Sequence, residues 1–266
     1  MSRLSKVFSD LKTQEKKAFI PFITAGDSGL ENTYELMNSL VESGADVIEL
    51  GVPFSDPMAD GPVIARSHER AVADNISLRD VLDLVKRFRQ TNDQTAIVLM
   101  GYLNPIEAFG FDNFSKAAKE CGVDGVLVVD MPPEEAHDLK QQLDQVEVDF
   151  IFLVAPTTTD DRLAFLATIA SGFVYFVSLK GVTGAGHLDI DSVKENMSRI
   201  RQYVDLPVGV GFGIKDAQSA RAVSATADAV IVGSALVSFV EQYGNDKHKM
   251  LSNVKNLAGE IANAIN

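Results

Sequence analysis

Short apolar runs alternate with amphipathic segments along the whole chain. Eight of these runs are rich in β-branched or other apolar residues and are predicted strands, at 19–24, 46–51, 96–100, 125–130, 150–154, 173–179, 208–211 and 229–233. Several are apolar at nearly every position, as is typical of strands covered on both faces. The alternation predicts repeated strand–helix units around a parallel sheet.

The segments between these runs have helical spacing. Leu30, Tyr34, Met37 and Val41 form one apolar stripe. A second stripe covers 78–88, and Ser77 with Asp80 forms a capping pair at its start. Further predicted helices lie at 111–121, 134–143, 161–170, 190–203, 216–224, 234–243 and 247–265, with one more inside 2–12.

Eight strand–helix units in 266 residues predict a closed (β/α)8 (TIM) barrel, a single domain over 1–266 with an extra N-terminal helix. Three similar turns support this interpretation, at 44–48, 122–126 and 226–230, where a small residue ends a helix and an Asp closes the turn. The competing fold, a doubly wound open sheet, more often stops at five or six strands.

The formal net charge is −13, from 24 Lys and Arg against 37 Asp and Glu. An acidic surface without a basic run argues against nucleic-acid and membrane-surface binding. The single cysteine, Cys121, excludes an internal disulfide framework, and with no apolar signal or spanning segment it favours a cytoplasmic protein. The histidines lack metal-ligand spacing, so no metal site is expected.

Candidate chemistry is concentrated after the second strand. Glu49 interrupts an apolar run and shares a face with Val47 and Gly51. If that face is the barrel interior, burial raises the pKa of Glu49 toward a value suited to general acid–base catalysis, whereas the alternative is a structural ion pair. Asp60 precedes Gly61-Pro62, where its alternative role is a helix N-cap.

Two glycine-rich turns follow the last two strands, at 209–214 and 233–235. In barrels, such turns and the helix N-termini behind them often bind phosphate through backbone N–H groups. A third glycine-rich segment, 179–187, has the composition of a mobile lid, with a disordered surface loop as the alternative. The pair Asn104-Pro105 is interpreted as a turn.

Taken together, the stretches 21–27, 48–62, 181–184 and 211–214 resemble the tryptophan synthase alpha subunit family, and the resemblance covers nearly the whole chain. It implies a (β/α)8 lyase that cleaves indole-3-glycerol phosphate, by a retro-aldol step, into indole and glyceraldehyde 3-phosphate. Glu49 is then the general acid–base and Asp60 its partner carboxylate.

The resemblance also assigns binding residues. It places phosphate on Gly184, Gly213 and Ser234, in a site shaped by Gly211, Phe212, Gly233 and Ala235. It places the indole ring among Phe22, Leu50, Ile64, Met100, Tyr102, Leu127 and Tyr175, with Thr183 as the lid residue that meets Asp60.

The implied partner is a beta subunit in an alpha2beta2 heterotetramer, which takes up indole and holds pyridoxal phosphate, so no cofactor is expected in this chain. The loop 53–60, the Asn104-Pro105 turn and the lid form the implied partner surface. The alternatives are another phosphate-binding barrel enzyme, such as indole-glycerol phosphate synthase or an aldose–ketose isomerase, and a non-catalytic activating subunit.

Overall fold

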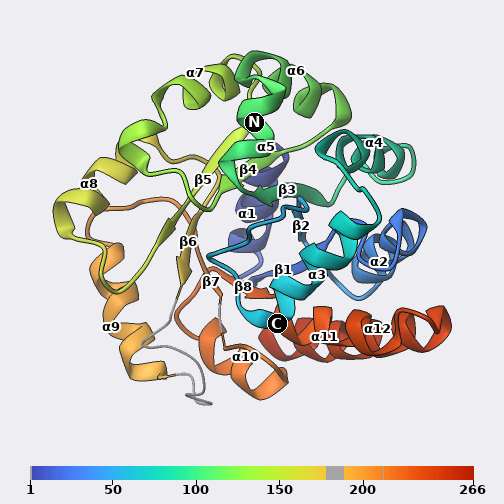
Figure 1. Ribbon diagram of the computed structural model, residues 1–266. Coiled ribbons are helices and arrows are strands. Elements are labelled where there is room, and N and C mark those ends of the chain that lie inside the picture. Colours follow the sequence, from blue (N-terminus) through green and yellow to red (C-terminus); the bar gives the residue numbers. More distant parts are fainter. Residues whose placement is uncertain (1, 178–188, 212) are drawn as a thin grey trace.

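The computed structural model describes residues 2–177, 189–211 and 213–266, which form a closed barrel of parallel strands in sequence order (Figure 1). Each strand pairs with the next, and β8 pairs with β1 to close the sheet. This confirms the predicted (β/α)8 fold. The strands are β1 (Ala18–Thr24), β2 (Val47–Gly51), β3 (Ala96–Gly101), β4 (Gly125–Val128), β5 (Asp149–Val154), β6 (Val174–Val177), β7 (Val208–Gly211) and β8 (Ala229–Val232).

Helices surround the sheet, while α1 lies across one end of the barrel (Figure 1). The helices are α1 (Arg3–Thr13), α2 (Leu30–Glu42), α3 (Pro62–Ala73), α4 (Leu78–Arg89), α5 (Leu103–Phe109), α6 (Phe111–Cys121), α7 (His137–Gln145), α8 (Asp160–Ile169), α9 (Ile190–Ile200), α10 (Ala217–Ser224), α11 (Ser234–Tyr243) and α12 (Lys247–Ile265), with a 3-10 turn at Pro133–Glu135. The Ser77–Asp80 capping box at the start of α4 is present as predicted.

The strands separate two apolar cores. The inner core fills the barrel with alternate strand residues, and Leu4 and Phe8 of α1 close its lower end. The Phe8 ring packs against Phe173, with 5.7 Å between the ring centroids. The outer core lies between the sheet and the helices. Because side chains alternate along a strand, one face of each strand is available to the barrel interior.

The three repeated Asp residues hold neighbouring strands together. Asp46 accepts a hydrogen bond from the Phe19 N–H at 2.8 Å, and Asp228 accepts one from the Val208 N–H at 2.9 Å. Asp124 does the same for the Ile97 N–H at 2.7 Å. Each carboxylate therefore reaches the start of the preceding strand, a longer-range role than closing its own turn.

The sequence interpretation of Asn104-Pro105 as a turn was wrong. Both residues lie in the first turn of α5, which begins after Tyr102. Proline is tolerated there because the N–H groups of a first helical turn have no acceptor within the helix. The prolyl residue is therefore compatible with this helix and does not prevent it.

Replacing Asp124 with Ala is expected to lower the free energy of unfolding by about 3–5 kcal/mol, measured by urea denaturation. Asp124 is buried and also pairs with Arg3 and Arg89, so its loss leaves the largely buried Arg89 without its carboxylate. Asp112→Ala is the control, because that side chain is 57 % exposed. Equal, small losses in both variants would contradict this role for Asp124.

Candidate active site

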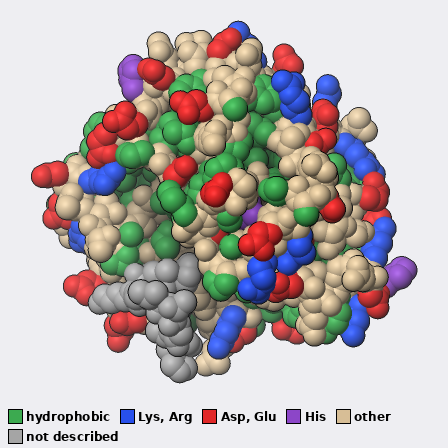
Figure 2. Space-filling model, in the orientation of Figure 1, with side chains coloured by type: hydrophobic (Ala, Val, Ile, Leu, Met, Phe, Trp, Pro, Cys, Tyr) green, Lys and Arg blue, Asp and Glu red, His purple; other side chains and the backbone are tan. Residues whose placement is uncertain are grey.

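A cavity of about 1060 Å³ opens at the carboxyl ends of the strands. Figure 2 shows apolar side chains gathered toward the middle of one face, with charged side chains largely around its edge. The expected site residues that line the cavity are Phe22, Glu49, Asp60, Ile64, Met100, Tyr175, Gly213, Gly233, Ser234 and Ala235. The fold thus brings most of the described candidates to one place.

Glu49 lies in the middle of β2, where it is 1 % exposed. It shares its strand face with Val47, which belongs to the inner core, so the side chain points into the barrel. Among the described residues, its Oε1 atom has no hydrogen-bond partner. Burial raises the pKa of Glu49 to about 8, and the nearby charge of Asp60 acts in the same direction. Glu49 is therefore mostly protonated at pH 7.

Asp60 ends the loop that connects β2 to α3. Its Oδ2 accepts a hydrogen bond from the Tyr102 hydroxyl at 2.7 Å, and that hydroxyl accepts one from the Ala59 N–H at 3.1 Å. Burial raises the pKa of Asp60, while the hydrogen bond from Tyr102 opposes this shift. The N-cap alternative is wrong, because Gly61 occupies that position and α3 has no side-chain cap. Asp60 is thus held by Tyr102 and left to face the cavity.

The glycine-rich turns border the other side of the cavity. Gly233 precedes α11, whose first residue is Ser234, and both line the cavity together with Gly213. Gly213 has a φ of 75°, a left-handed conformation that favours glycine. The start of α11 supplies backbone N–H groups that have no acceptor within the helix. This side can accept an anion without a basic cluster.

Two further glycines make room for aromatic rings. A Cβ on Gly211 would lie 2.1 Å from the Tyr175 hydroxyl, and one on Gly51 would lie 2.7 Å from the Phe22 ring. Neither distance is compatible with a side chain, so each ring occupies space that only glycine leaves open. The glycines therefore shape the cavity wall as well as its anion-binding side.

Not every expected residue reaches the cavity. Leu50 follows Glu49 on β2, points to the opposite face and belongs to the outer core, so it is not placed to touch a ligand. Leu127 is a fully buried member of the inner core and does not line the cavity. Tyr102 contacts Asp60 rather than the open space. Thr183, Gly184 and Phe212 lie outside the described residues.

Several lining residues were absent from the sequence-based set. Val129 and Ile231 are barrel-facing residues on or just after strands, and strict alternation along each run would have found them. Asp130, Met131 and Lys215 lie in loops, where no periodicity applies. His68 does not line the cavity, but it lies one turn after Ile64 and hence on the same face of α3.

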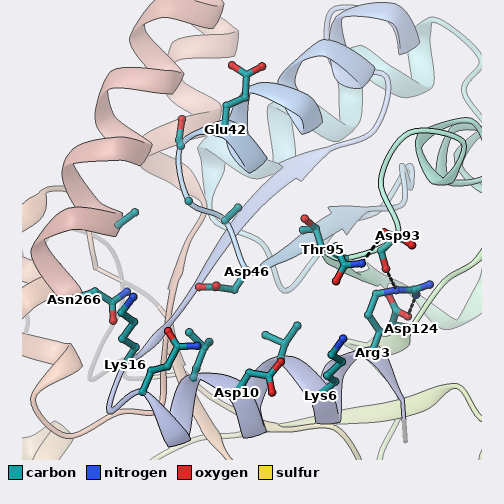
Figure 3. A pocket seen from close by; sticks show the side chains of 18 of the residues that line it. Arg3, Lys6, Asp10, Lys16, Glu42, Asp46, Asp93, Thr95, Asp124 and Asn266 are labelled. Carbon is teal, nitrogen blue, oxygen red and sulfur yellow. Dashed lines mark hydrogen bonds and ion pairs between the residues drawn. The ribbon is translucent and has the colours of Figure 1, made fainter.

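A second cavity, of about 1430 Å³, lies at the other end of the barrel (Figure 3). It is lined mainly by α1, α12 and the turns before β2, β3 and β4. Two of its charged side chains have structural roles, since Arg3 pairs with Asp124 and Asp46 holds the Phe19 N–H. We assign this end of the barrel to stability.

Within the described ranges, no three His, Cys, Asp or Glu residues are arranged to hold a metal ion. The helices of these ranges include none with the length and apolar character of a membrane span.

Comparisons with known sequences agree with this geometry. A family model described as the tryptophan synthase alpha chain matches residues 8–266. A relative with that name from Ruthia magnifica subsp. Calyptogena magnifica is 72% identical over 265 residues, covering 100% of both chains. Another, from Burkholderia thailandensis, is 59% identical over 242 residues, covering 91% of this chain and 89% of its own.

Solved structures show the same similarity. The tryptophan synthase subunit alpha from Legionella pneumophila superposes with a TM-score of 0.93 at 42% identity, covering 100% of this chain and 98% of its own. A chain of the aminoacrylate-bound tryptophan synthase from M. tuberculosis gives a TM-score of 0.89 at 34% identity, with 100% of both chains covered.

The buried Glu49 predicts a pH-dependent stability. An unfolded Glu releases its proton near 4.5, whereas folded Glu49 holds it to about 8. The folded state binds more protons between these values, so the free energy of unfolding falls as pH rises through them. Relative to the native chain, Glu49→Gln is expected to gain stability from pH 5 to pH 9, by on the order of a few kcal/mol.

Urea denaturation at the two pH values measures this gain. Glu42→Gln is the matched control, because its side chain is 64% exposed. A constant difference between Glu49→Gln and the native chain at both pH values would contradict the raised pKa.

Proposed function

The chain belongs to the tryptophan synthase alpha chain family, and from that premise we propose that its barrel is a lyase of tryptophan synthesis that cleaves indole-3-glycerol phosphate. The products are indole and glyceraldehyde 3-phosphate. The observation that carries the proposal is the buried Glu49, whose pKa is raised by its burial and by the charge of Asp60, in a cavity whose far side offers backbone N–H groups. A proton donor, an anion and a phosphate site are what this reaction needs.

Glu49 supplies the proton transfers. Indole is a poor leaving group as a carbanion, so its carbon 3 must be protonated before the carbon–carbon bond breaks. A neutral carboxyl group can donate that proton, and the carboxylate it becomes can take the proton of the glycerol hydroxyl as the bond to carbon 3 breaks. A pKa near 8 suits both transfers, because a group whose pKa lies close to the working pH can both donate and accept a proton.

Asp60 stabilises the charge that develops on the ring. Protonation at carbon 3 makes the ring nitrogen positive, and a carboxylate that accepts the ring N–H stabilises that charge. The hydrogen bond from Tyr102 favours the ionised form of Asp60. The two carboxyl groups thus have separate tasks, set by their different surroundings.

The ends of the cavity hold the two parts of the substrate. Gly213, Gly233 and Ser234 line the side suited to the phosphate, with Ala235 beside them and Gly211 giving space to Tyr175. The ring of the indole fits the apolar wall of Phe22, Ile64, Met100 and Tyr175. Three of the expected residues remain proposals: Thr183 as the lid residue that meets Asp60, Gly184 as a phosphate contact and Phe212 as part of the phosphate site.

The chain uses no cofactor of its own in this reaction, which needs only proton transfer and charge stabilisation. Indole passes to a beta subunit, which holds pyridoxal phosphate, within an alpha2beta2 complex in the cytoplasm. The loop 53–60 is suited to that contact, because Met58 within it is 82% exposed. A loop that carries both Met58 and Asp60 would couple partner binding to catalysis.

Glu49→Gln is expected to lower kcat for indole release from indole-3-glycerol phosphate by about 10²–10⁴-fold, because Gln cannot transfer the proton. Asp60→Asn is expected to lower it by about 10²–10³-fold through lost charge stabilisation. Both are measured by following indole from the purified variants, with and without beta subunit.

Glu42→Gln again serves as the control and should retain the native rate. A native chain that releases no indole even with beta subunit would overturn the function. Native-like turnover by Glu49→Gln would overturn only the mechanism.

Met58→Asp is expected to weaken binding to a beta subunit by about tenfold or more, because it places a charge where an apolar contact forms. Isothermal titration calorimetry measures the affinity. Phe165→Asp is the matched control, since Phe165 is 40% exposed on α8, away from the loop. Equal affinities for both variants would contradict this partner surface.

A further inference from the structure

His68 is a buried histidine whose two ring nitrogens both face the active-site loop. It lies on α3, 2 % exposed. The Phe54 N–H donates a hydrogen bond to Nδ1 at 3.1 Å, and Nε2 lies 3.6 Å from the Oδ2 atom of Asp60. One ring thus joins the start of the loop to the carboxylate at its end.

These contacts fix the tautomer of the ring. Because Nδ1 accepts a hydrogen bond, the neutral imidazole carries its proton on Nε2, directed at Asp60. Burial lowers the pKa of His68 to about 4, so the ring is neutral above that pH. His68 therefore presents a neutral N–H group to Asp60. A positively charged ring would bind the carboxylate more strongly and would compete with a substrate cation.

The ring belongs to a packed cluster around Asp60. It meets the edge of Tyr102 with 6.3 Å between ring centroids at 79°, and Tyr102 stacks on Phe54 at 5.0 Å. The Tyr102 hydroxyl donates to the same Oδ2 that His68 faces. Among the described residues, Oδ1 has no hydrogen-bond donor of its own. The cluster thus lies against Oδ2 of Asp60 and leaves Oδ1 to face the substrate.

We propose that His68 is a positioning residue for the reaction, which turns Asp60 Oδ1 toward the indole nitrogen and fixes the loop 53–60 in the conformation that this requires. The proposal rests on the proposed function, since it assigns Asp60 its task. It goes beyond that function because the residue acts only through Asp60 and never touches substrate.

The simpler alternative is a structural role, in which His68 only accepts the hydrogen bond from the Phe54 N–H. The two roles can be separated, because each nitrogen has its own conservative substitute. The amide oxygen of Asn can replace Nδ1 and hold the Phe54 N–H, but Asn is too short to reach Asp60. The amide N–H of Gln can replace that of Nε2 and reach Asp60, but it leaves the Phe54 N–H without its acceptor. A positioning role and a structural role therefore predict opposite orders of activity.

The experiment measures kcat, KM and their pH dependence for indole release by His68→Asn and His68→Gln. His68→Asn is expected to lower kcat about tenfold with KM nearly unchanged, because the lost donor faced a charged group. It is also expected to move the acidic limb of the kcat profile to higher pH, since a carboxylate without that donor is protonated more readily. His68→Gln should restore most of kcat and the native limb.

The limbs can be assigned because, among the residues that the structure describes, few titratable groups face Asp60. These are Glu49 on β2, Tyr102 after β3 and Tyr175 on β6, besides His68 itself. Glu49 governs the alkaline limb near pH 8, and burial raises the pKa of both tyrosines above that range. The acidic limb belongs either to Asp60 or to His68 itself, whose pKa is about 4. Because His68→Gln also lacks the imidazole, a native acidic limb in that variant assigns the limb to Asp60.

His248→Asn, at an exposed position of α12, is the matched control and should keep native kinetics. Native kcat and an unmoved acidic limb in folded His68→Asn would overturn the proposal, as would a His68→Gln less active than His68→Asn. If circular dichroism shows that His68→Asn does not fold, His68→Gln decides, and a loss of tenfold or more in it overturns the proposal. A native chain without indole release would instead overturn the proposed function.

Discussion

The burial of the Glu49 carboxyl group inside a closed sheet is the constraint on which the site depends. A parallel barrel has one interior, and Glu49 occupies a position there that the inner core otherwise fills with apolar side chains. A charged group at such a position loses its hydration, so the neutral form is favoured. The protein therefore holds a proton donor at neutral pH, at a cost in stability that grows as the pH rises.

The rest of the site is arranged around that donor. Asp60 lies at the rim, where the Tyr102 hydroxyl favours its ionised form and His68 faces the same oxygen. Glycine turns at the opposite rim offer backbone N–H groups, so an acidic protein needs no lysine cluster to hold a phosphate. α1 closes the lower end of the barrel, which leaves the upper end as the open face of the interior.

Much of this could be predicted from the sequence, because hydrophobic periodicity reports burial directly. The strand order, the face that Glu49 shares with Val47 and the glycine turns follow from spacing alone. The errors occurred where contacts distant in sequence decide the structure. Pro105 lies in the first turn of α5, where the Leu103 N–H donates a hydrogen bond to Asp130 at 2.8 Å. Asp60 turns from the helix end toward Tyr102. The role of His68 depends on atoms of a folded loop, which no periodicity encodes.

A direct titration of the Glu49 carboxyl group tests the central claim. Infrared difference spectra between the native chain and Glu49→Gln, recorded from pH 4 to pH 10, follow the protonated carboxyl band of this one residue. A band is expected at pH 7 that disappears with a midpoint near 8. A midpoint near the ordinary value of 4.5, with no band at pH 7, would contradict it.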